Sequence, residues 1–172
     1  FTHLFNAMPP LLSREPGMVG AALVDESSWF GIIADGHHVH PAVVKAAVRA
    51  KWRGGAILVT DAMPTVGTPD NAFELAGERV VAENGRLAMA DGTLAGAHLD
   101  MHSAVKNVME YAALDRCEAL RMASTYPARA LGLAQELGAI RPGMRASLVV
   151  LDQGQRLVDV WVDGERYGPT SA

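Results

Sequence analysis

Polar side chains that can do chemistry stand at the ends of three strand-like segments. His3 lies in the opening segment, His38 follows the apolar run Trp29–Asp35, and Asp61 ends the run Ala56–Asp61. Parallel strands of an α/β sheet or barrel hold their ligands at the carboxyl ends, where the following loops meet. A histidine there can bind a metal, carry a proton or simply pack, so position alone leaves the role of His3 open.

Asp61 suits the part of a proton carrier in metal-assisted hydrolysis. That reaction needs ligands on rigid positions, a water made acidic by a metal ion, and a carboxylate that takes and returns a proton. Asp61 follows an almost continuously apolar strand, which is a rigid place for such a carboxylate. The same residue types also allow Asp61 to cap the turn that follows the strand.

Three histidines, His37, His38 and His40, follow the turn at Gly36. Successive residues of a loop point apart, so the three cannot all face one ion. We therefore expect one functional histidine and two at the surface, and select His38, which lies two residues beyond Gly36.

Arg14 lies in the loop after the opening segment, next to Glu15. A guanidinium group there can bind a phosphate or a carboxylate through paired hydrogen bonds. An ion pair with Glu15 or another acid is the alternative. His98 and His102 flank a helix start, and we expect both to be surface or packing residues.

A strand–helix–strand unit should position these loops. Pro41 opens an amphipathic helix that runs to about Lys51, between two apolar runs typical of a parallel sheet covered on both faces. His38 and Asp61 should then emerge on one rim. Further on, turn and helix signals predict a hairpin, three helices and two final strand regions, at residues 78–89, 103–113, 115–124, 125–132, 146–151 and 157–167.

Composition indicates one globular α/β domain, or one domain with a small appendage. The chain has 172 residues, 49% of them hydrophobic, and a net charge of −4 without a basic patch, which argues against nucleic-acid binding. Its apolar stretches are too short or too interrupted by charge to span a membrane. The single cysteine, Cys117, indicates a reducing, cytoplasmic setting, and its helical pattern predicts that it packs in the core. Phe1 is not an initiator Met, and we expect the second half of a longer protein.

Together these motifs resemble a known family. They occur in this order and at similar spacing in N-acetylglucosamine-6-phosphate deacetylases of the amidohydrolase superfamily: Thr2–Met8, Arg14–Gly17, Ile33–Val39, Val59–Ala62 and Leu94–Gly96. The stretch 141–152 is similar to the superfamily's C-terminal return to its small β domain. The resemblance covers nearly the whole chain.

The resemblance implies an α/β fold made of two parts. Residues 1–143 would be the last part of a (β/α)8 TIM-like barrel, and residues 144–172 the C-terminal strands of a small β-sandwich domain. A complete barrel takes about 250 residues, so the N-terminal half of the same protein would be a missing partner. The resemblance further implies a cytoplasmic homodimer that acts in amino-sugar catabolism.

The resemblance also implies a reaction, the hydrolysis of the acetamide of N-acetylglucosamine 6-phosphate to glucosamine 6-phosphate and acetate. Asp61 would be the catalytic acid and base. His3 would bind a divalent metal, zinc in the first place, with iron, manganese or cobalt as alternatives. The other residues would bind the phosphosugar: Asn6, the Ala7 N–H and Arg14 (across the dimer interface) at its phosphate, His38 to orient it, and Leu94, Ala95 and Gly96 near its acetyl group.

Two other functions stay open. A catalytic zinc site typically has three protein ligands, and His3 with Asp61 falls short of that number. The family's other ligands, a glutamate and a histidine, come from barrel strands that would precede Phe1. The chain could therefore be a non-catalytic sugar-phosphate-binding or assembly module, or belong to another amidohydrolase-superfamily hydrolase. The expected partners include neither a nucleic acid nor a membrane.

Overall fold

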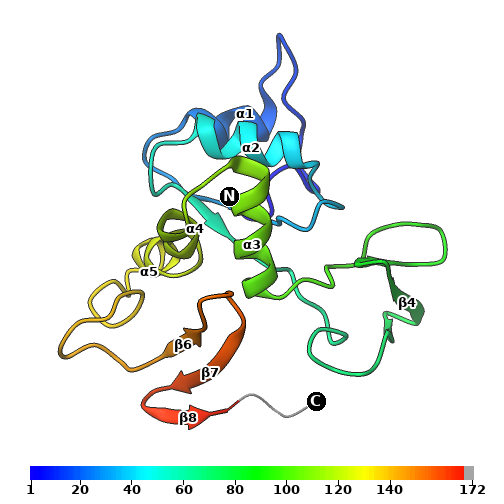
Figure 1. Ribbon diagram of the computed structural model, residues 1–172. Coiled ribbons are helices and arrows are strands. Elements are labelled where there is room, and N and C mark those ends of the chain that lie inside the picture. Colours follow the sequence, from blue (N-terminus) through cyan, green and yellow to red (C-terminus); the bar gives the residue numbers. More distant parts are fainter. Residues whose placement is uncertain (169–172) are drawn as a thin grey trace.

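A parallel strand–helix–strand unit forms the centre of the computed structural model, which describes residues 1–168 (Figure 1). Strand β1 (Phe30–Ile32) leads through helix α2 (Pro41–Ala50) into strand β2 (Ala56–Leu58), and β1 pairs with β2 in parallel. Pro41 at the first helical position and the side chain of His40, which accepts a hydrogen bond from the Ala42 N–H, begin α2. The predicted unit is confirmed.

Four chain segments lie side by side in sequence order around this unit. The opening residues run along β1, where the Leu4 N–H donates to the Gly31 oxygen (2.7 Å) and the Gly31 N–H to the Phe1 oxygen (2.8 Å). Beyond β2, Ala62 pairs in parallel with Ala97. The ends of four neighbouring segments, and the loops that follow them, therefore meet along one rim.

Helices cover one face of this sheet. Helix α3 (Met101–Ala112) packs against α2 and against α4 (Arg116–Ala123), and α4 and α5 (Thr125–Ala130) contact β2. Asp100 and Asp115 cap the amino ends of α3 and α4 through the N–H groups of Ser103 and Glu118. The main core holds buried side chains from all these elements, among them Leu4, Phe30, Ile32, Val44, Leu58, Val108 and Met122.

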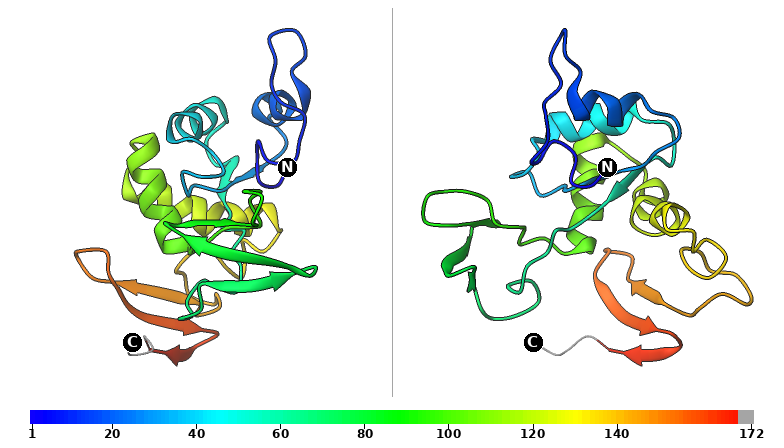
Figure 2. Two further views of the ribbon diagram at one scale, coloured as in Figure 1. Left: turned by 90° about the vertical axis from the view of Figure 1, so that its right-hand side faces the viewer. Right: turned by 180° about the vertical axis from the view of Figure 1, so that it is seen from behind.

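Two small antiparallel sheets follow outside this core (Figure 2). The first contains β3 (Ala72–Leu75), β4 (Glu78–Glu83) and β5 (Arg86–Ala88), and it has its own buried cluster of Val80, Leu87 and Ala95. The second contains β6 (Leu148–Leu151), β7 (Leu157–Val162) and β8 (Glu165–Tyr167). Within residues 1–168, every helix is too short or too polar to cross a membrane.

Three features differ from the sequence predictions. Helix α1 (Gly17–Val24) and strand β3 were not predicted. The eight residues of α1 contain no polar side chain, so they show no helical periodicity. Cys117 lies in the predicted helix, but it is exposed and does not pack in the core.

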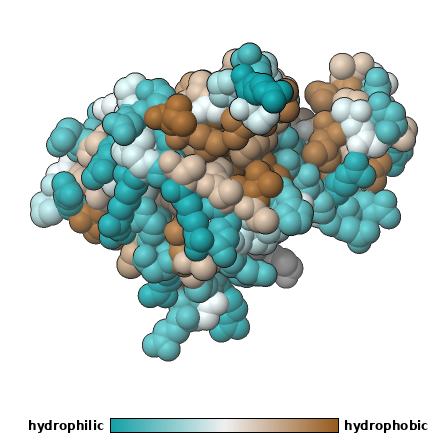
Figure 3. Space-filling view, turned by 90° about the horizontal axis from the view of Figure 1, so that it is seen from above, coloured by the Kyte–Doolittle hydropathy of each residue, from teal (hydrophilic) through white to brown (hydrophobic). Residues whose placement is uncertain are grey.

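Apolar side chains also gather on the face formed by α1, α2 and the loop of residues 8–16, which Figure 3 shows from above. Several of them are large and exposed, including Leu11, Leu12, Met18 and Val24. Exposed apolar patches of this kind are typical of surfaces that contact another chain or another domain.

The Lys51 ammonium group closes the carboxyl end of α1. It is 6% exposed and donates to the carbonyl oxygens of Ala22 and Asp25, both at 2.6 Å. The last carbonyls of a helix have no partner within the helix, and a cation there is favourable. Burial lowers the pKa of Lys51, while the charge of Asp25 acts in the opposite direction.

Replacing Lys51 with alanine should lower the free energy of unfolding by about 2–3 kcal/mol, because the carbonyls of Ala22 and Asp25 lose a charged donor. Urea denaturation measures this loss. Lys45→Ala on the same helix is the matched control and should change stability by less than about 0.5 kcal/mol. Equal losses in the two variants would show that Lys51 contributes nothing specific.

Candidate active site at the carboxyl ends of the strands

His3 lies in a tight turn in which the side chains of His3 and Asn6 form hydrogen bonds with backbone carbonyls. Its Nδ1 lies 3.0 Å from the Asn6 carbonyl oxygen, and the Asn6 side-chain amide donates to the carbonyls of His3 and Leu4. Because a carbonyl can only accept, Nδ1 is the donor, and Nε2 has no hydrogen-bond partner among residues 1–168. His3, Phe5 and Ala7 all have positive φ, at 35°, 78° and 51°. Such strain gathers at ligand sites.

His38 follows β1 and rests on Asp35. The Asp35 carboxylate lies 2.6 Å from His38 Nδ1 and also accepts the N–H groups of His37 and His38, both at 2.8 Å. Burial acts to raise the pKa of Asp35, but these three hydrogen bonds outweigh it and hold the pKa below its usual value. The carboxylate therefore stays ionised. His37 and His40 are exposed, as expected.

Asp61 and Leu94–Gly96 lie next to one another. The Ala97 N–H donates to the backbone carbonyl oxygen of Asp61 at 2.8 Å, and the Met63 N–H donates to the backbone carbonyl oxygen of Ala97 at 3.1 Å. Asp61 is exposed and has a φ of 53°. A Cβ added to Gly96 would collide with the Met63 side chain and lie 3.1 Å from the Asp61 oxygen. Gly96 is thus the residue that lets the two segments approach.

Further contacts hold the segment that contains Gly96 beside the segment that follows Asp61. Thr65, almost fully buried, places its Oγ1 2.9 Å from Nδ1 of the exposed His98. Leu94 pairs with Ala88 across an isolated bridge, and Ala95 is buried in the small core. The segment that carries Gly96 is therefore anchored on both sides.

Arg14 is not brought to these loops by the contacts of residues 1–168. It is exposed in the loop of residues 8–16, which projects at the top of Figure 1. Among the described ion pairs none involves Arg14, so the alternative pairing with Glu15 is not formed. Ala7, next to the His3 turn, is exposed.

His3 fits a metal as a single ligand. Its protonated Nδ1 is fixed by a carbonyl and its Nε2 is free, which is how metal-binding histidines are commonly held. In the part of the chain that the structure describes, no group of three or more His, Cys, Asp or Glu side chains is placed to hold an ion. The described residues thus supply part of a metal site.

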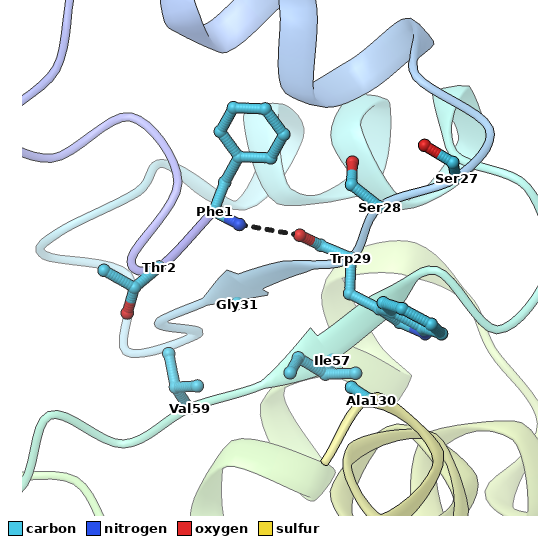
Figure 4. Close-up of a pocket in the computed structure, with 9 residues that line it drawn as sticks. All are labelled: Phe1, Thr2, Ser27, Ser28, Trp29, Gly31, Ile57, Val59 and Ala130. Atoms are coloured by element: carbon cyan, nitrogen blue, oxygen red, sulfur yellow. Dashed lines mark hydrogen bonds between the residues drawn. The ribbon is translucent and has the colours of Figure 1, made fainter. Parts of the chain in front are cut away.

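A pocket of about 510 Å³ lies between the opening residues, the strands β1 and β2, and the end of helix α5 (Figure 4). Phe1, Trp29, Ile57 and Val59 line it, and Ile57 and Val59 are half-buried while their neighbour Leu58 is buried toward the helices. Among the described residues, the side of the sheet that carries Ile57 and Val59 is only partly covered, so the coverage of both faces stays a prediction. None of the predicted site residues lines this pocket.

Sequence reasoning missed Asp35 and Asn107. The Asn107 side chain donates to the Ala34 oxygen at 2.8 Å and so ties α3 to the end of β1. An aspartate two residues before the first histidine could have been found, because aspartate at a turn commonly accepts the N–H groups that follow it. Nothing local in the sequence pairs residue 107 with residue 34.

Comparison with known proteins finds relatives over nearly the whole chain. The amidohydrolase family model matches residues 30–167. A putative N-acetylgalactosamine-6-phosphate deacetylase of Escherichia coli K12 is 45% identical over 164 residues, which are 95% of this chain and 97% of the relative. N-acetylgalactosamine-6-phosphate deacetylase of Escherichia coli O157:H7 is also 45% identical, but the match covers only 43% of it. N-acetylglucosamine-6-phosphate deacetylase of Haemophilus influenzae is 37% identical, with 95% and 43% covered.

Solved structures of proteins with related names have the same fold over nearly the whole chain. N-acetylglucosamine-6-phosphate deacetylase from Pasteurella multocida superimposes with a TM-score of 0.91 at 34% identity, over 97% of this chain and 44% of that one. A variant of the Mycobacterium smegmatis enzyme, in complex with N-acetyl-D-glucosamine-6-phosphate, gives 0.86 at 34% identity, over 96% and 44%. The chain thus spans less than half the length of most of these proteins. The predicted resemblance is confirmed, and the chain belongs to the amidohydrolase family.

Proposed function

We propose that the protein hydrolyses the acetamide of an N-acetylated amino-sugar 6-phosphate, with N-acetylglucosamine 6-phosphate as the first candidate. The reaction adds water across the C–N bond and gives acetate and the free amine. One observation carries the proposal: the loops that hold His3, His38 and Asp61 follow neighbouring segments of one sheet in a member of this family.

The proposal includes a larger protein. Residues 1–143 would form the last part of a (β/α)8 barrel, and residues 144–172 the C-terminal part of a small β-sandwich. The half-exposed side chains of Ile57 and Val59 support this, because alternate side chains of barrel strands fill the barrel interior. The exposed valines Val149 and Val158 on β6 and β7 support a second sheet packed there. The N-terminal half of the protein would supply both coverings.

His3 would hold a divalent metal together with ligands from that N-terminal half. Zinc is the first candidate, and iron, manganese or cobalt also accept imidazole and carboxylate ligands. When bound, such an ion lowers the pKa of water and polarises a carbonyl oxygen. The free Nε2 of His3 supports this assignment.

The chain's own residues would do the remaining work. Asp61 takes a proton from the attacking water and delivers it to the amine that leaves. His38 orients the sugar, and Asn6 and the Ala7 N–H contact its phosphate. Leu94, Ala95 and Gly96 contact the acetyl group, and Gly96 lets their segment approach Asp61. Binding energy from the phosphate and the ring then holds the acetamide in register.

N-acetylgalactosamine 6-phosphate is a second candidate substrate. Relatives named for the galactosamine sugar share 45% identity with this chain, whereas the Haemophilus influenzae relative named for the glucosamine sugar shares 37%. The two sugars differ only in the orientation of one hydroxyl group, so a single binding residue can separate them.

Acetate release by the full-length protein tests the proposal. Both sugar phosphates and unphosphorylated N-acetylglucosamine are supplied as substrates, with and without a chelator. We expect one acetate per amine from a phosphosugar, and loss of the activity with the chelator. Phosphosugar binding without acetate release would identify a binding module, and equal rates on the unphosphorylated sugar would indicate another hydrolase.

We further propose a cytoplasmic location, since the exposed Cys117 is a free thiol.

Arg14→Ala should raise KM for the sugar phosphate about 10- to 100-fold, because the phosphate loses its hydrogen bonds to a guanidinium group that is exposed and has no ion-pair partner among residues 1–168. The KM for the unphosphorylated sugar should stay within about twofold. Arg49→Ala on α2 is the control. Equal losses on both substrates would exclude a phosphate contact. If Arg14 acts across a dimer, mixing the variant with Asp61→Asn protein should restore part of the activity.

A further inference from the structure

The Asp35 carboxylate is buried at the end of the segment that follows β1, with 5% of its side chain exposed. One oxygen accepts the N–H groups of His37 and His38, and the other lies 2.6 Å from His38 Nδ1. The two oxygens therefore have different tasks, because one closes the turn and the other faces the imidazole.

This arrangement leaves one nitrogen of His38 available. Nδ1 faces an ionised carboxylate, which can only accept, so Nδ1 carries the proton. The ring is 6% exposed, yet Nε2 has no hydrogen-bond partner among residues 1–168. In that part of the chain, the only buried side-chain nitrogen or oxygen without a partner is Trp29 Nε1. His38 Nε2 is therefore accessible to solvent.

Neighbouring residues fix the backbone on both sides of Asp35. Asn107 on α3 holds the Ala34 oxygen directly before Asp35. Gly36 has a φ of 79°, and a Cβ there would lie 3.1 Å from the Tyr111 hydroxyl, so the turn is closed from the side of α3. Burial raises the pKa of Tyr111, and the charges of Glu110 and Asp35 raise it further. The phenol thus stays neutral beside the carboxylate.

We propose that Asp35 is a positioning residue for the reaction, which holds His38 with its proton on Nδ1 and its Nε2 lone pair toward the substrate. The inference rests on the proposed function. Nε2 then accepts a hydrogen bond from a hydroxyl or amide N–H of the sugar. A carboxylate partner that fixes the tautomer and orientation of a functional histidine is a common device of enzyme sites.

Asp35→Asn separates this role from a purely structural one. The asparagine oxygen can still accept both backbone N–H groups, so the turn is kept. Its NH₂ group then faces His38 Nδ1 and can only donate, which moves the ring proton from Nδ1 to Nε2. The substitution therefore reverses the hydrogen-bonding sense of Nε2 at nearly constant shape.

The experiment combines ¹⁵N NMR of the histidine ring with steady-state kinetics on the full-length protein. Wild type should show His38 protonated on Nδ1, and Asp35→Asn should show it protonated on Nε2. In the variant kcat/KM should fall about 10- to 100-fold, mainly through KM, with little change in the melting temperature. Asp91→Asn is the matched control, because Asp91 closes a similar turn with the Thr93 N–H but faces no histidine.

Two results overturn the inference: a wild-type ring protonated on Nε2, or an Asp35→Asn variant whose kcat/KM stays within twofold of wild type. The wild-type spectrum decides the first even if the variant does not fold. The tautomer is also readable in a protein that releases no acetate. A silent enzyme with the Nδ1 tautomer would thus contradict the proposed function, whereas an active enzyme with the Nε2 tautomer would contradict only the role of Asp35.

Discussion

Asp61→Asn in the full-length protein should reduce turnover of the phosphosugar by about 10²- to 10⁴-fold. An amide has nearly the shape of a carboxylate but cannot take a proton from water or return one to an amine. Asp61 is exposed at the rim and held by its backbone, through the Ala97 N–H, so the substitution leaves the fold unchanged. Acetate release measures the loss.

Binding should survive the same substitution. Calorimetric titration of the sugar phosphate into Asp61→Asn should give a Kd within about fivefold of wild type, since the proposed phosphate and ring contacts come from other loops. Asp70→Asn, an exposed aspartate further along the same segment, is the matched control and should retain full turnover. Turnover of Asp61→Asn within tenfold of wild type would show that the proton is carried elsewhere.

His3→Ala should weaken the metal affinity of the full-length protein by more than about 100-fold, and turnover should fall with the loss of metal. The turn places one free imidazole nitrogen at the rim, and alanine offers no ligand there. Metal content by mass spectrometry after dialysis against a weak chelator measures the loss.

His102→Ala is the control for His3→Ala, because this histidine lies at the start of α3 and is not a proposed ligand. It should keep the wild-type metal content. A His3→Ala protein that binds metal as tightly as wild type would remove the strongest reason for placing an ion at this rim.

The sequence predicted the parts of the fold that local signals specify. Pro41 begins α2, and residues 78–89 form a hairpin that turns at Asn84–Gly85, both as expected. Helix α4 lies within the predicted range 115–124, whereas α3 begins two residues before its predicted start, after the Asp100 cap. Helix α1 was missed because a uniformly apolar octapeptide has no period. It forms because its apolar side chains pack on the core and Lys51 closes its end, and both are tertiary effects.

The sequence predicts candidate residues for the site, but it does not predict the long-range contacts that support them. Strand ends identify His3, His38 and Asp61, because chain order and parallel pairing place their loops together. The partners of His3 and His38 are local in sequence. The contacts that hold the surrounding segments, such as Asn107 with Ala34 and Gly96 with Asp61, are distant in sequence. Arg14 depends on a neighbour outside the described contacts, so its role stays a prediction.

A crystal structure of full-length Asp61→Asn protein, grown with zinc and a sugar phosphate, tests the shared site most directly. The account predicts the ion on His3 Nε2, the His38 Nε2 at hydrogen-bond distance from the sugar, and the acetamide between the ion and residue 61. A sugar bound elsewhere, for example in the pocket beside Trp29, with these three side chains free of it, would contradict the account.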